Sequence, residues 1–558
     1  MGGSERQARP ARAAVPHGAR RDRWAVTGRL RSLSLALSFA ARTVLDDPAW
    51  LMLNAVQRAP SRLRPVLGRP ARWLERRVSQ EKNPAGAASL RAAWARGDAH
   101  TVVDAVPTSR AATRVQARVT EQVELLRARP APVHPRSRAS APREPLRVHH
   151  HLTNSLPHTL SGYTQRTHAA LTAQRRAGIE LSVSTRLGYP ATIGVPLAPG
   201  SDTVDAIRYE RLVPWTFQPD HRKRLACEVD LLCTRITAAG SQIVHTTTPW
   251  TTGEAGRLAA ARLGLPWVHE VRGLPEETWA ASHGTVERRE AAMQSTRYRL
   301  IRDKETELAT AADAVITLSA TMREELIARG VDADRIAVIP NSVDVDALAG
   351  LPDPSVARRS LGLPPDRPLV GSVGSLVGYE GLDTTLRAVA MLRSRGIDVG
   401  ALIVGDGVAR PDLLQLVSSL GLQDVAHLPG RVDRATAARY VAALDVVAIP
   451  RRADRVTRLV TPLKPVEAMA VGRPVVVSDL PALREVTTTS EDSHAALVAS
   501  AGDPHEWADR IGEILGDPDL RDRLVSAGHL IANDRTWVRA ASTYRTVYEN
   551  CLVSARSL

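Results

Sequence analysis

One segment near the C-terminal end of the chain has the residue types that an anion-binding helix needs. Residues 461–470 read Thr-Pro-Leu-Lys-Pro-Val-Glu-Ala-Met-Ala. Thr461 is a good N-cap and Pro462 suits the first helical turn, so the next N–H groups are expected to point out of the helix start. That end favours phosphate, and Lys464 adds a full cation. Glu467 lies one turn further along, where it can accept hydrogen bonds from hydroxyl groups.

A solvent-exposed helix without a function could have the same composition, so the interpretation depends on the surrounding elements. From residue 146 onward, short apolar runs alternate with longer amphipathic stretches. This pattern is typical of parallel strands joined by crossover helices. A first series occupies residues 146–345 and a second occupies residues 346–535. The sequence therefore predicts an α/β fold with two doubly wound, Rossmann-like domains, in which ligands lie at the carboxyl ends of the strands.

The N-terminal region differs from this body in charge. Residues 1–145 hold 27 Lys and Arg against 11 Asp and Glu, and the rest of the chain holds 47 against 48. Residues 1–30 are expected to form a disordered basic tail. Residues 31–129 show helical apolar spacing, and the five prolines of residues 130–145 predict an extended linker. At the other end, residues 536–558 are expected to form a C-terminal helix that packs back on the N-terminal lobe.

Composition also bears on the compartment. Three scattered cysteines fit a reducing environment and no disulfide framework, and their spacing suits no zinc site. No apolar run reaches the roughly 18 residues of a membrane-spanning helix, and no signal-peptide pattern opens the chain. We expect a cytoplasmic protein that can lie peripherally at the inner face of the membrane.

The Arg-rich region is a candidate for contact with anionic lipid headgroups. A solvated basic surface without a partner is the alternative. Nucleic acid is the less favoured partner, because residues 1–145 have no evident recognition helix and few aromatic side chains, with only four tryptophans, Trp24, Trp50, Trp73 and Trp94.

The second domain carries a series of short motifs in one order. They are Val-Gly-Ser-Val-Gly at 370–374, Gly-Leu-Asp at 381–383, Val-Gly-Asp-Gly at 404–407, Leu-Pro-Gly at 428–430, Leu-Asp-Val-Val at 444–447, Glu-Ala-Met-Ala at 467–470 and Gly-Arg-Pro-Val-Val at 472–476. This order resembles the retaining GT-B glycosyltransferases of family 4 (GT4, glycosyl transferases group 1), in an actinobacterial type with an extra basic N-terminal region. The resemblance covers residues 146–550 and implies that the two domains face each other across a cleft.

The resemblance implies a metal-independent hexosyltransferase of cell-envelope or polysaccharide biosynthesis. It would move a sugar from a nucleotide-diphosphate sugar, with retention of configuration, to a glycan, lipid-linked or small-molecule acceptor. No cofactor besides this co-substrate is implied, and no Asp-x-Asp-like metal motif stands at a strand end. The residues that would bind the nucleotide are Gly374, Gly405, Gly407, Gly430, Arg431, Val432 and Glu467.

A second group would bind the donor diphosphate and sugar: Gly162, Ser375, Arg451, Arg458, Thr461, Leu463 and Lys464. Gly162 belongs to a Ser-Gly-Tyr segment that resembles the family's glycine loop. Arg272 stands where many relatives have a histidine near the transferred sugar, so Arg272, Lys464 and Glu467 are the expected catalytic residues. Glu270, Glu276 and Glu277 are candidate acceptor contacts, with ordinary surface charge as the alternative.

The chain departs from the family pattern at three positions. The family commonly has two carboxylates separated by seven residues, and counting back from Glu467 puts Leu459 in place of the first. The arginine and lysine that usually clamp the diphosphate fall at Ser375 and Glu380. Lys464 and arginines of residues 451–458 would then have to meet the diphosphate charge.

Two other functions stay open at this point. A nucleotide-sugar epimerase of the same shape needs carboxylates around the sugar carbon, and the missing acid at Leu459 disfavours it. A membrane-surface or nucleic-acid binding protein could instead use an inactive transferase as a scaffold.

Overall fold

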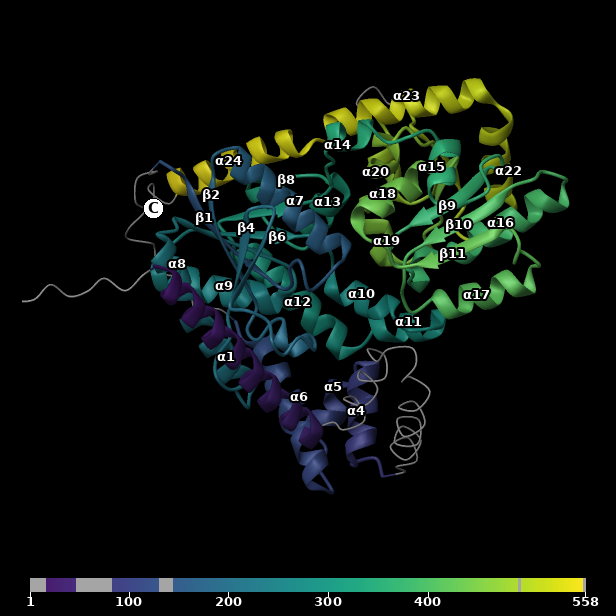
Figure 1. Cartoon of the computed structure of the whole chain (residues 1–558). Helices are drawn as coiled ribbons and strands as arrows, with labels where there is room; N and C mark the ends of the chain where they lie inside the picture. Colours follow the sequence, from purple (N-terminus) through teal and green to yellow (C-terminus); the bar gives the residue numbers. More distant parts are fainter. Residues whose placement is uncertain (1–16, 47–82, 130–143, 490–492, 555–558) are drawn as a thin grey trace, which may run out of the picture.

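The computed structural model describes residues 17–46, 83–129, 144–489 and 493–554 (Figure 1). Within them, two sheets form the centres of two lobes. The first sheet has the strand order β3-β4-β2-β1-β5-β6-β7-β8, and the second has the order β11-β10-β9-β12-β13-β14. Only the β3–β4 pair is antiparallel among these neighbours. Two Rossmann-like domains are therefore present, and the expected α/β fold is confirmed.

The first lobe contains strands β1 (Arg147–Leu152), β2 (Glu180–Thr185), β3 (Ser201–Val204), β4 (Ile207–Arg211), β5 (Ile243–Thr247), β6 (Trp267–Val271), β7 (Ala314–Thr317) and β8 (Ile336–Val338). Its connecting elements are α7 (Gly162–Arg176), η1 (Ala191–Ile193), α8 (His221–Ala239), α9 (Trp250–Leu263), α10 (Pro275–Ala281), α11 (Val286–Met293), α12 (Thr296–Ala311), α13 (Ala320–Ala328) and η2 (Ala333–Arg335).

The second lobe contains strands β9 (Leu369–Val373), β10 (Gly400–Val404), β11 (Ala426–Gly430), β12 (Val446–Ile449), β13 (Val475–Ser478) and β14 (Ala496–Ala499). Its helices are α14 (Val345–Ala349), α15 (Pro354–Ser360), η3 (Gly378–Glu380), α16 (Leu382–Ser394), α17 (Arg410–Ser419), α18 (Arg434–Ala442), α19 (Arg455–Leu459), α20 (Lys464–Ala470), α21 (Pro481–Thr487), α22 (Pro504–Gly516) and α23 (Pro518–Asp534).

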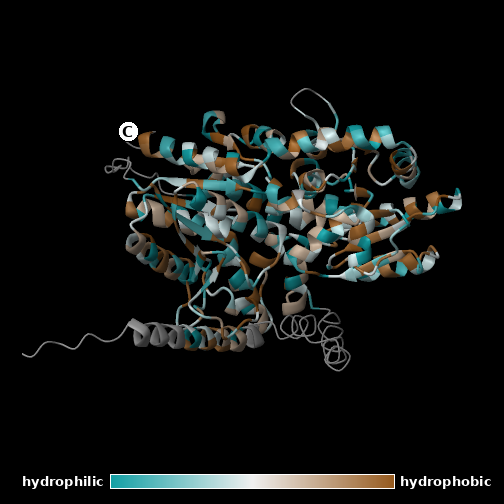
Figure 2. Ribbon diagram, turned by 45° about the horizontal axis from the view of Figure 1, so that its top comes forward, coloured by the Kyte–Doolittle hydropathy of each residue, from teal (hydrophilic) through white to brown (hydrophobic). Residues whose placement is uncertain are grey.

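The valine-rich strands of the second sheet are buried because helices cover both of its faces. Val447 and Val475 belong to one hydrophobic cluster, whereas Val446 and Val476 belong to the cluster on the other side. Successive strand residues point to opposite faces, so a continuous apolar run supplies both cores. Figure 2 shows hydrophobic and hydrophilic residues alternating along the outer helices, as expected for helices with one face against a sheet.

The three histidines of β1 are buried structural groups. His149 lies within hydrogen-bond distance of Ser182 and Ser184, and His150 lies 3.1 Å from the Gln174 side chain. Burial lowers the pKa of His149 to about 3, so its imidazole is neutral at physiological pH. These imidazoles form hydrogen bonds with serine and glutamine side chains inside the lobe, which is a structural role.

The chain crosses from the second lobe back to the first. Helix α24 (Trp537–Ser554) packs against α7 and contributes Tyr544 and Tyr548 to a core cluster under the first sheet (Figure 1). At the crossing point Val343 and Thr536 form an isolated parallel bridge. The two chain segments that join the lobes therefore lie side by side.

Four described helices precede the first strand: α1 (His17–Asp46), α4 (Ala87–Arg96), α5 (Ala99–Val103) and α6 (Arg110–Arg127). Because α1 begins at His17, the expectation of a disordered tail is wrong for residues 17–30; residues 1–16 and 130–143 lie outside the described ranges. Helix α1 packs along the first lobe with Leu35 fully buried, which explains its order. None of the described helices is long and apolar enough to cross a bilayer.

Candidate functional site

Three glycine-containing loops meet at the carboxyl ends of β9, β10 and β11. The Gly405 amide donates to the Gly430 carbonyl at 2.9 Å. A Cβ on Gly405 would lie 1.8 Å from the Gly374 carbonyl oxygen, and one on Gly407 would lie 2.2 Å from that of Leu376. Glycine at these two positions is thus required by the close packing of the loops, whatever they bind. The predicted nucleotide site lies at the edge of the sheet where such ligands bind.

The neighbouring residues divide between surface and core. Arg431 follows β11 and is exposed, whereas Val432 packs against a hydrophobic cluster of the lobe. Ser375 is exposed in the loop after β9. Arg431 and Ser375 can reach a ligand in this region, and Val432 can do so only through its main chain.

A buried ion-pair cluster occupies the centre of this region. The Glu380 carboxylate accepts hydrogen bonds from Arg451 at 2.8 Å and from Lys464 at 2.9 Å, and its side chain is 7% exposed. Burial alone would raise the pKa of Glu380, but the two cations outweigh it and hold the pKa at about 2. A Cβ on Gly374 would lie 2.7 Å from Lys464 Cε, so the glycine makes room for the lysine. Glu380, which stands where the family usually has a lysine, is therefore the counter-ion of both Arg451 and Lys464.

Helix α20 begins later than the sequence suggested. Its first residue is Lys464, Leu463 is the N-cap, and Pro465 takes the place in the first turn that was expected for Pro462. Thr461 is buried, and its carbonyl oxygen accepts from the Asn341 amide of the first lobe at 3.0 Å. The prediction of Thr461 as N-cap is wrong, because the N-cap carbonyl accepts from the amide four residues later and Pro465 has no N–H.

Glu467 lies in the first turn of α20. Burial raises its pKa, while the charges of Arg434 and Lys464 act in the opposite direction. Arg434 also donates to the Gln165 side chain of the first lobe at 3.1 Å, so it bridges the cleft. Sequence reasoning missed Arg434, for which the only signal was a cation shortly after the Gly430 turn.

The loop before α20 is attached to the opposite lobe. Arg455 donates to Glu277 and to Glu325, both at 2.6 Å, and Arg289 pairs with Asp454 at 3.1 Å. Arg455 is thus engaged with carboxylates of the first lobe. It is a fixed contact between the lobes and not a free cation for a diphosphate.

The other loop arginines also separate by partner. Arg452 donates to Asp383 at 3.2 Å. Arg458 is exposed on α19 and lies close enough to lower the pKa of Asp479, after the stronger effects of Arg484 and burial. Arg451 alone among these arginines shares a counter-ion with Lys464. The structure therefore brings Arg451 and Lys464 together, and it does not bring Arg458 to them.

The first lobe has a pocket of about 490 Å³ at the carboxyl ends of β1, β5 and β6. Its walls are rich in hydroxyl groups and contain one cation and no carboxylate. The lining residues are Leu152, Thr153, Asn154, Ser161, Tyr163, Thr164, Thr167, Thr247, Thr248, Pro249, Arg272, Gly273, Leu274, Pro275, Thr278, Trp279 and Ser282. Gly162 is exposed beside this pocket at the start of α7, where a Cβ would meet nothing within 4 Å.

The Glu270 carboxylate fixes the position of Arg272, and its oxygens also accept hydrogen bonds from other groups of the protein. Glu270 accepts from Arg272 at 2.7 Å, from Arg166 at 3.1 Å and from Tyr544 at 3.0 Å, and His245 lies 3.2 Å from it. Although burial opposes ionisation, Arg272, His245 and Arg166 hold the pKa of Glu270 well below its usual range. The expectation that Glu270 contacts an acceptor is therefore wrong, because its oxygens already serve the protein.

The other two candidate acceptor contacts are also engaged. Glu276 is fully buried and accepts from Arg329 at 2.8 Å. Glu277 accepts from Arg455 and from the Tyr298 hydroxyl. Neither side chain lines the pocket. Both were read as surface charges or ligand contacts, but they join elements of the protein.

Tyr163 is a further residue that sequence reasoning did not single out. It follows Gly162, lines the pocket, and its hydroxyl would lie 2.9 Å from a Cβ on Gly273. Although the residue is 55% exposed, partial desolvation raises the pKa of its hydroxyl, and the charges of Arg451 and Arg272 lower it. Tyr163 thus stands between the pocket of the first lobe and the ion-pair cluster of the second.

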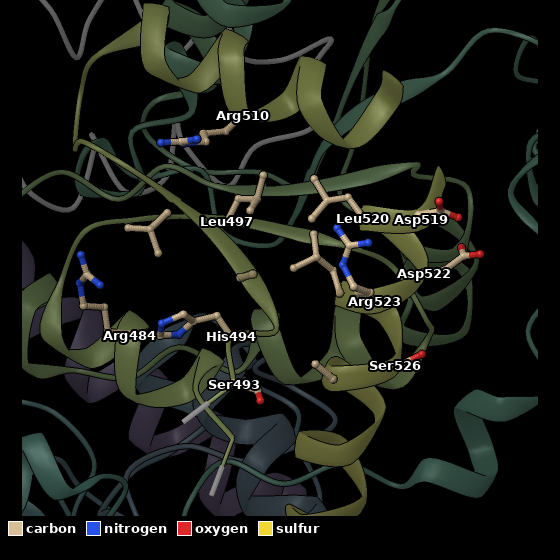
Figure 3. Close-up of a pocket in the computed structure, with 14 residues that line it drawn as sticks. Arg484, Ser493, His494, Leu497, Arg510, Asp519, Leu520, Asp522, Arg523 and Ser526 are labelled. Carbon is tan, nitrogen blue, oxygen red and sulfur yellow. The ribbon is translucent and has the colours of Figure 1, made fainter. Parts of the chain in front are cut away.

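A larger hollow, of about 970 Å³, lies at the β14 edge of the second lobe (Figure 3). Arg484, Arg510 and Arg523 line it, together with residues of β14 and α23. None of the predicted site residues is among its lining residues. No group of three potential metal ligands was found anywhere in the part of the chain that the structure describes.

Two such lobes, with a loop cluster on one and a hydroxyl-lined pocket on the other, define a GT-B glycosyltransferase. The family model described as glycosyl transferase 4-like domain matches residues 161–342, and that of glycosyl transferases group 1 matches residues 367–517. A D-inositol 3-phosphate glycosyltransferase of Xylanimonas cellulosilytica is 31% identical over 55% of this chain and 71% of its own length. That of Nocardia farcinica is 31% identical over 54% of this chain and 65% of its own. The chain belongs to the glycosyl transferases group 1 family and is a transferase.

Solved structures agree in fold. Sucrose-phosphate synthase from Thermosynechococcus elongatus superposes with a TM-score of 0.60 at 22% identity, over 73% of this chain and 100% of that one. HepE of Anabaena, in complex with UDP and glucose, gives a TM-score of 0.54 at 20% identity over the same shares of the two chains. These matches support the GT-B architecture.

Proposed function

We propose that the protein is a retaining, metal-independent glycosyltransferase that moves a sugar from a nucleotide-diphosphate sugar to a hydroxyl of its acceptor. The observation that carries this proposal is the position of Lys464 and Arg451 beside the glycine loops of β9 and β10. Two cations at that place suit the charge of a diphosphate, and Glu467 is available for the ribose. UDP in the related HepE structure is consistent with a donor of this class.

The pocket at the strand ends of the first lobe is the proposed acceptor site. Its hydroxyl-rich wall and single arginine suit a polyhydroxylated compound, neutral or phosphorylated. Relatives with 31% identity are named for D-inositol 3-phosphate, which makes that compound a rational first acceptor to test. A glycan and a lipid-linked sugar remain acceptors of the same chemistry.

In the proposed reaction, negative charge develops on the departing diphosphate. Preorganised cations lower the energy of such a transition state, so Lys464 and Arg451 are assigned to this role. The ammonium of Lys464 has three donors, and a contact with Glu380 leaves others for phosphate oxygens. Arg272, held rigidly by Glu270, supplies positive charge on the acceptor side. A nucleotide-sugar epimerase is less favoured, because no carboxylate lines the pocket.

The test begins with a thermal-shift panel of UDP, GDP and ADP sugars, followed by calorimetric titration of the nucleotide that stabilises most. Lys464→Ala and Glu467→Ala are each expected to weaken nucleotide binding. Arg395→Ala removes an exposed ion pair with Asp509 on α22 and serves as the control. Unchanged binding in both site variants would overturn the assignment, and product analysis without acceptor separates transfer from epimerisation.

We also propose that the enzyme works in the cytoplasm, at an anionic membrane surface reached through α1. Leu30 and Leu37 of α1 are more than half exposed, and Arg29 and Arg31 flank the first of them. The Arg31 guanidinium lies 5.1 Å from the ring centroid of Trp215, a half-exposed tryptophan of the first lobe. Apolar side chains edged by arginine suit an interface with acidic headgroups.

Flotation with phosphatidylcholine vesicles, with and without phosphatidylglycerol, tests this contact. The protein is expected to float only with the acidic lipid, and the double change Leu30→Glu with Leu37→Glu is expected to abolish flotation. Equal flotation of the variant and the parent protein would contradict the role of α1. Retention by nucleic acid in a parallel filter assay would favour the alternative partner.

A further inference from the structure

The N-terminal helices touch the wall of the proposed acceptor pocket through a stack of three side chains. Trp279 lines the pocket from α10, and the Arg297 guanidinium carbon lies 4.8 Å from the centroid of its ring. The same carbon lies 4.7 Å from the ring centroid of Trp94 on α4. Arg297 is thus held between a tryptophan of the N-terminal region and a tryptophan of the pocket.

Main-chain contacts fix this stack. The Arg297 amide donates to the Gly97 carbonyl at 3.0 Å, and the Arg297 guanidinium donates to the Trp94 carbonyl at 3.3 Å. Gly97 caps α4 with a φ of 90°, and a Cβ there would lie 2.7 Å from Cη2 of Trp279. The turn after α4 therefore lies directly against the pocket tryptophan, with no room for a side chain between them.

No carboxylate among the residues that the structure describes forms an ion pair with Arg297. Burial lowers the pKa of its guanidinium to about 10. The guanidinium remains protonated at neutral pH and is stabilised by the two ring faces instead. Removing one ring would leave a partly buried cation with one ring contact and its hydrogen bond to the Trp94 carbonyl.

The N-terminal helices are firmly attached to the element that bears Arg297. Leu300 and Ile301 of α12 belong to the same hydrophobic cluster as Val119 and Leu126 of α6. Lys304 of α12 is buried and donates to the Ala128 carbonyl at 2.9 Å. Helices α4, α5 and α6 thus form a layer on α12, close to α10 (Figure 1).

We infer that this N-terminal layer is a specificity element of the acceptor site, in which Trp94 acts through Arg297 as a positioning residue for Trp279. The inference rests on the proposed function of the pocket. In Figure 1 the layer lies below α10, whereas β9, β10 and β11 lie above it, so we expect an effect on the acceptor and not on the nucleotide. This gives the N-terminal region a catalytic relevance that is independent of its charge and of any membrane contact.

Trp94→Ala is the decisive variant and Trp94→Phe is the conservative one. Val115→Ala, in the core of the N-terminal layer but outside the stack, is the control for general loosening. Hydrogen exchange of the full-length protein needs no substrate: Trp94→Ala is expected to accelerate exchange in residues 275–281, whereas Trp94→Phe and Val115→Ala leave that segment protected. Exchange in β9 and α20 is expected to stay unchanged in all three.

Kinetics with D-inositol 3-phosphate as the acceptor probe adds a functional readout. Loss of one cation–π contact and of its packing is expected to raise the acceptor KM about tenfold in Trp94→Ala, with recovery in Trp94→Phe and an unchanged Kd for UDP. Unaltered exchange in α10 overturns the inference, as does a parallel loss of UDP binding. If the parent protein fails to bind UDP, the proposed function falls while the exchange result still decides on the layer.

Discussion

The replacement Glu380→Gln tests the most unusual feature of the donor region. The side chain keeps its shape but loses the charge that balances Arg451 and Lys464. The pKa of Glu380 is about 2 in the folded protein against 4.5 for the free group. At 1.36 kcal/mol per pKa unit, the folded environment favours the carboxylate by about 3 kcal/mol at neutral pH. The side chain is 7% exposed, so solvent screening reduces this figure little.

Urea denaturation at pH 7, followed by intrinsic tryptophan fluorescence, to which the buried Trp507 contributes, and by circular dichroism, measures the effect. We expect Glu380→Gln to lower the free energy of unfolding by about 3 kcal/mol, because two buried cations lose their counter-ion. Asp383→Asn breaks the more exposed Arg452 pair and is expected to cost less than about 1 kcal/mol. Equal, small losses in the two variants would refute the reasoning.

The pH dependence follows from the same pKa. Since the folded-state pKa is depressed, the stabilisation is fully present above pH 4.5 and is lost as the pH falls towards 2. Glu380→Gln is expected to flatten this part of the acid-unfolding curve. The variant is also expected to bind UDP more tightly, since the diphosphate no longer competes with a carboxylate for Lys464. Weaker binding would show instead that Glu380 holds the cations in their binding positions.

Two more predictions concern glutamates and arginines between elements. Burial raises the pKa of Glu305 to about 8, and one of its oxygens has no partner. As the pH rises from 4.5 to 8, the unfolded chain loses this proton before the folded protein does, so stability falls over that range. Glu305→Gln is expected to be about 4 kcal/mol more stable than the parent protein at pH 8 and unchanged at pH 4.5. The same dependence of thermal unfolding on pH in the variant and the parent protein would contradict this. Arg455→Ala is expected to increase the radius of gyration in small-angle scattering, because it releases Glu277 and Glu325 of the first lobe. Arg452→Ala is the control, because the partner of Arg452 lies in its own lobe. The same radius of gyration in both variants would argue against a role of Arg455 in holding the lobes together.

Local patterns were sufficient to predict the architecture. Alternating apolar runs and amphipathic stretches marked the two sheets, because each strand and crossover helix has its own periodicity. The glycine loops could also be placed, since a turn at the end of a strand restricts the residue within that turn. Lys464 and Gly374, which lie in contact, were both singled out on such local grounds.

Pairs made by tertiary folding left no comparable signal. Glu380 was visible only as a departure from a family pattern, and its partner Arg451 is 71 residues away. Trp94 and Arg297 are 203 residues apart and belong to different layers. Thr461 was predicted as an N-cap, but its carbonyl accepts from Asn341 of the other lobe, and that contact could not be read from the sequence. In each case the charge and size of the residue could be read from the sequence, but the residue that it contacts in the fold could not.

The crossing of the chain at Val343 and Thr536 has a consequence for protein engineering. The amide of Val343 donates to the Arg535 carbonyl at 2.9 Å, so the entry and exit of the second lobe are hydrogen-bonded neighbours. In topological terms the second lobe is an insertion into the first, with both junctions at one point. Adjacent junctions are the arrangement that tolerates exchange of an inserted domain. A foreign nucleotide-binding lobe could thus be inserted between Val343 and Thr536, while α24 still packs under the sheet of the first lobe.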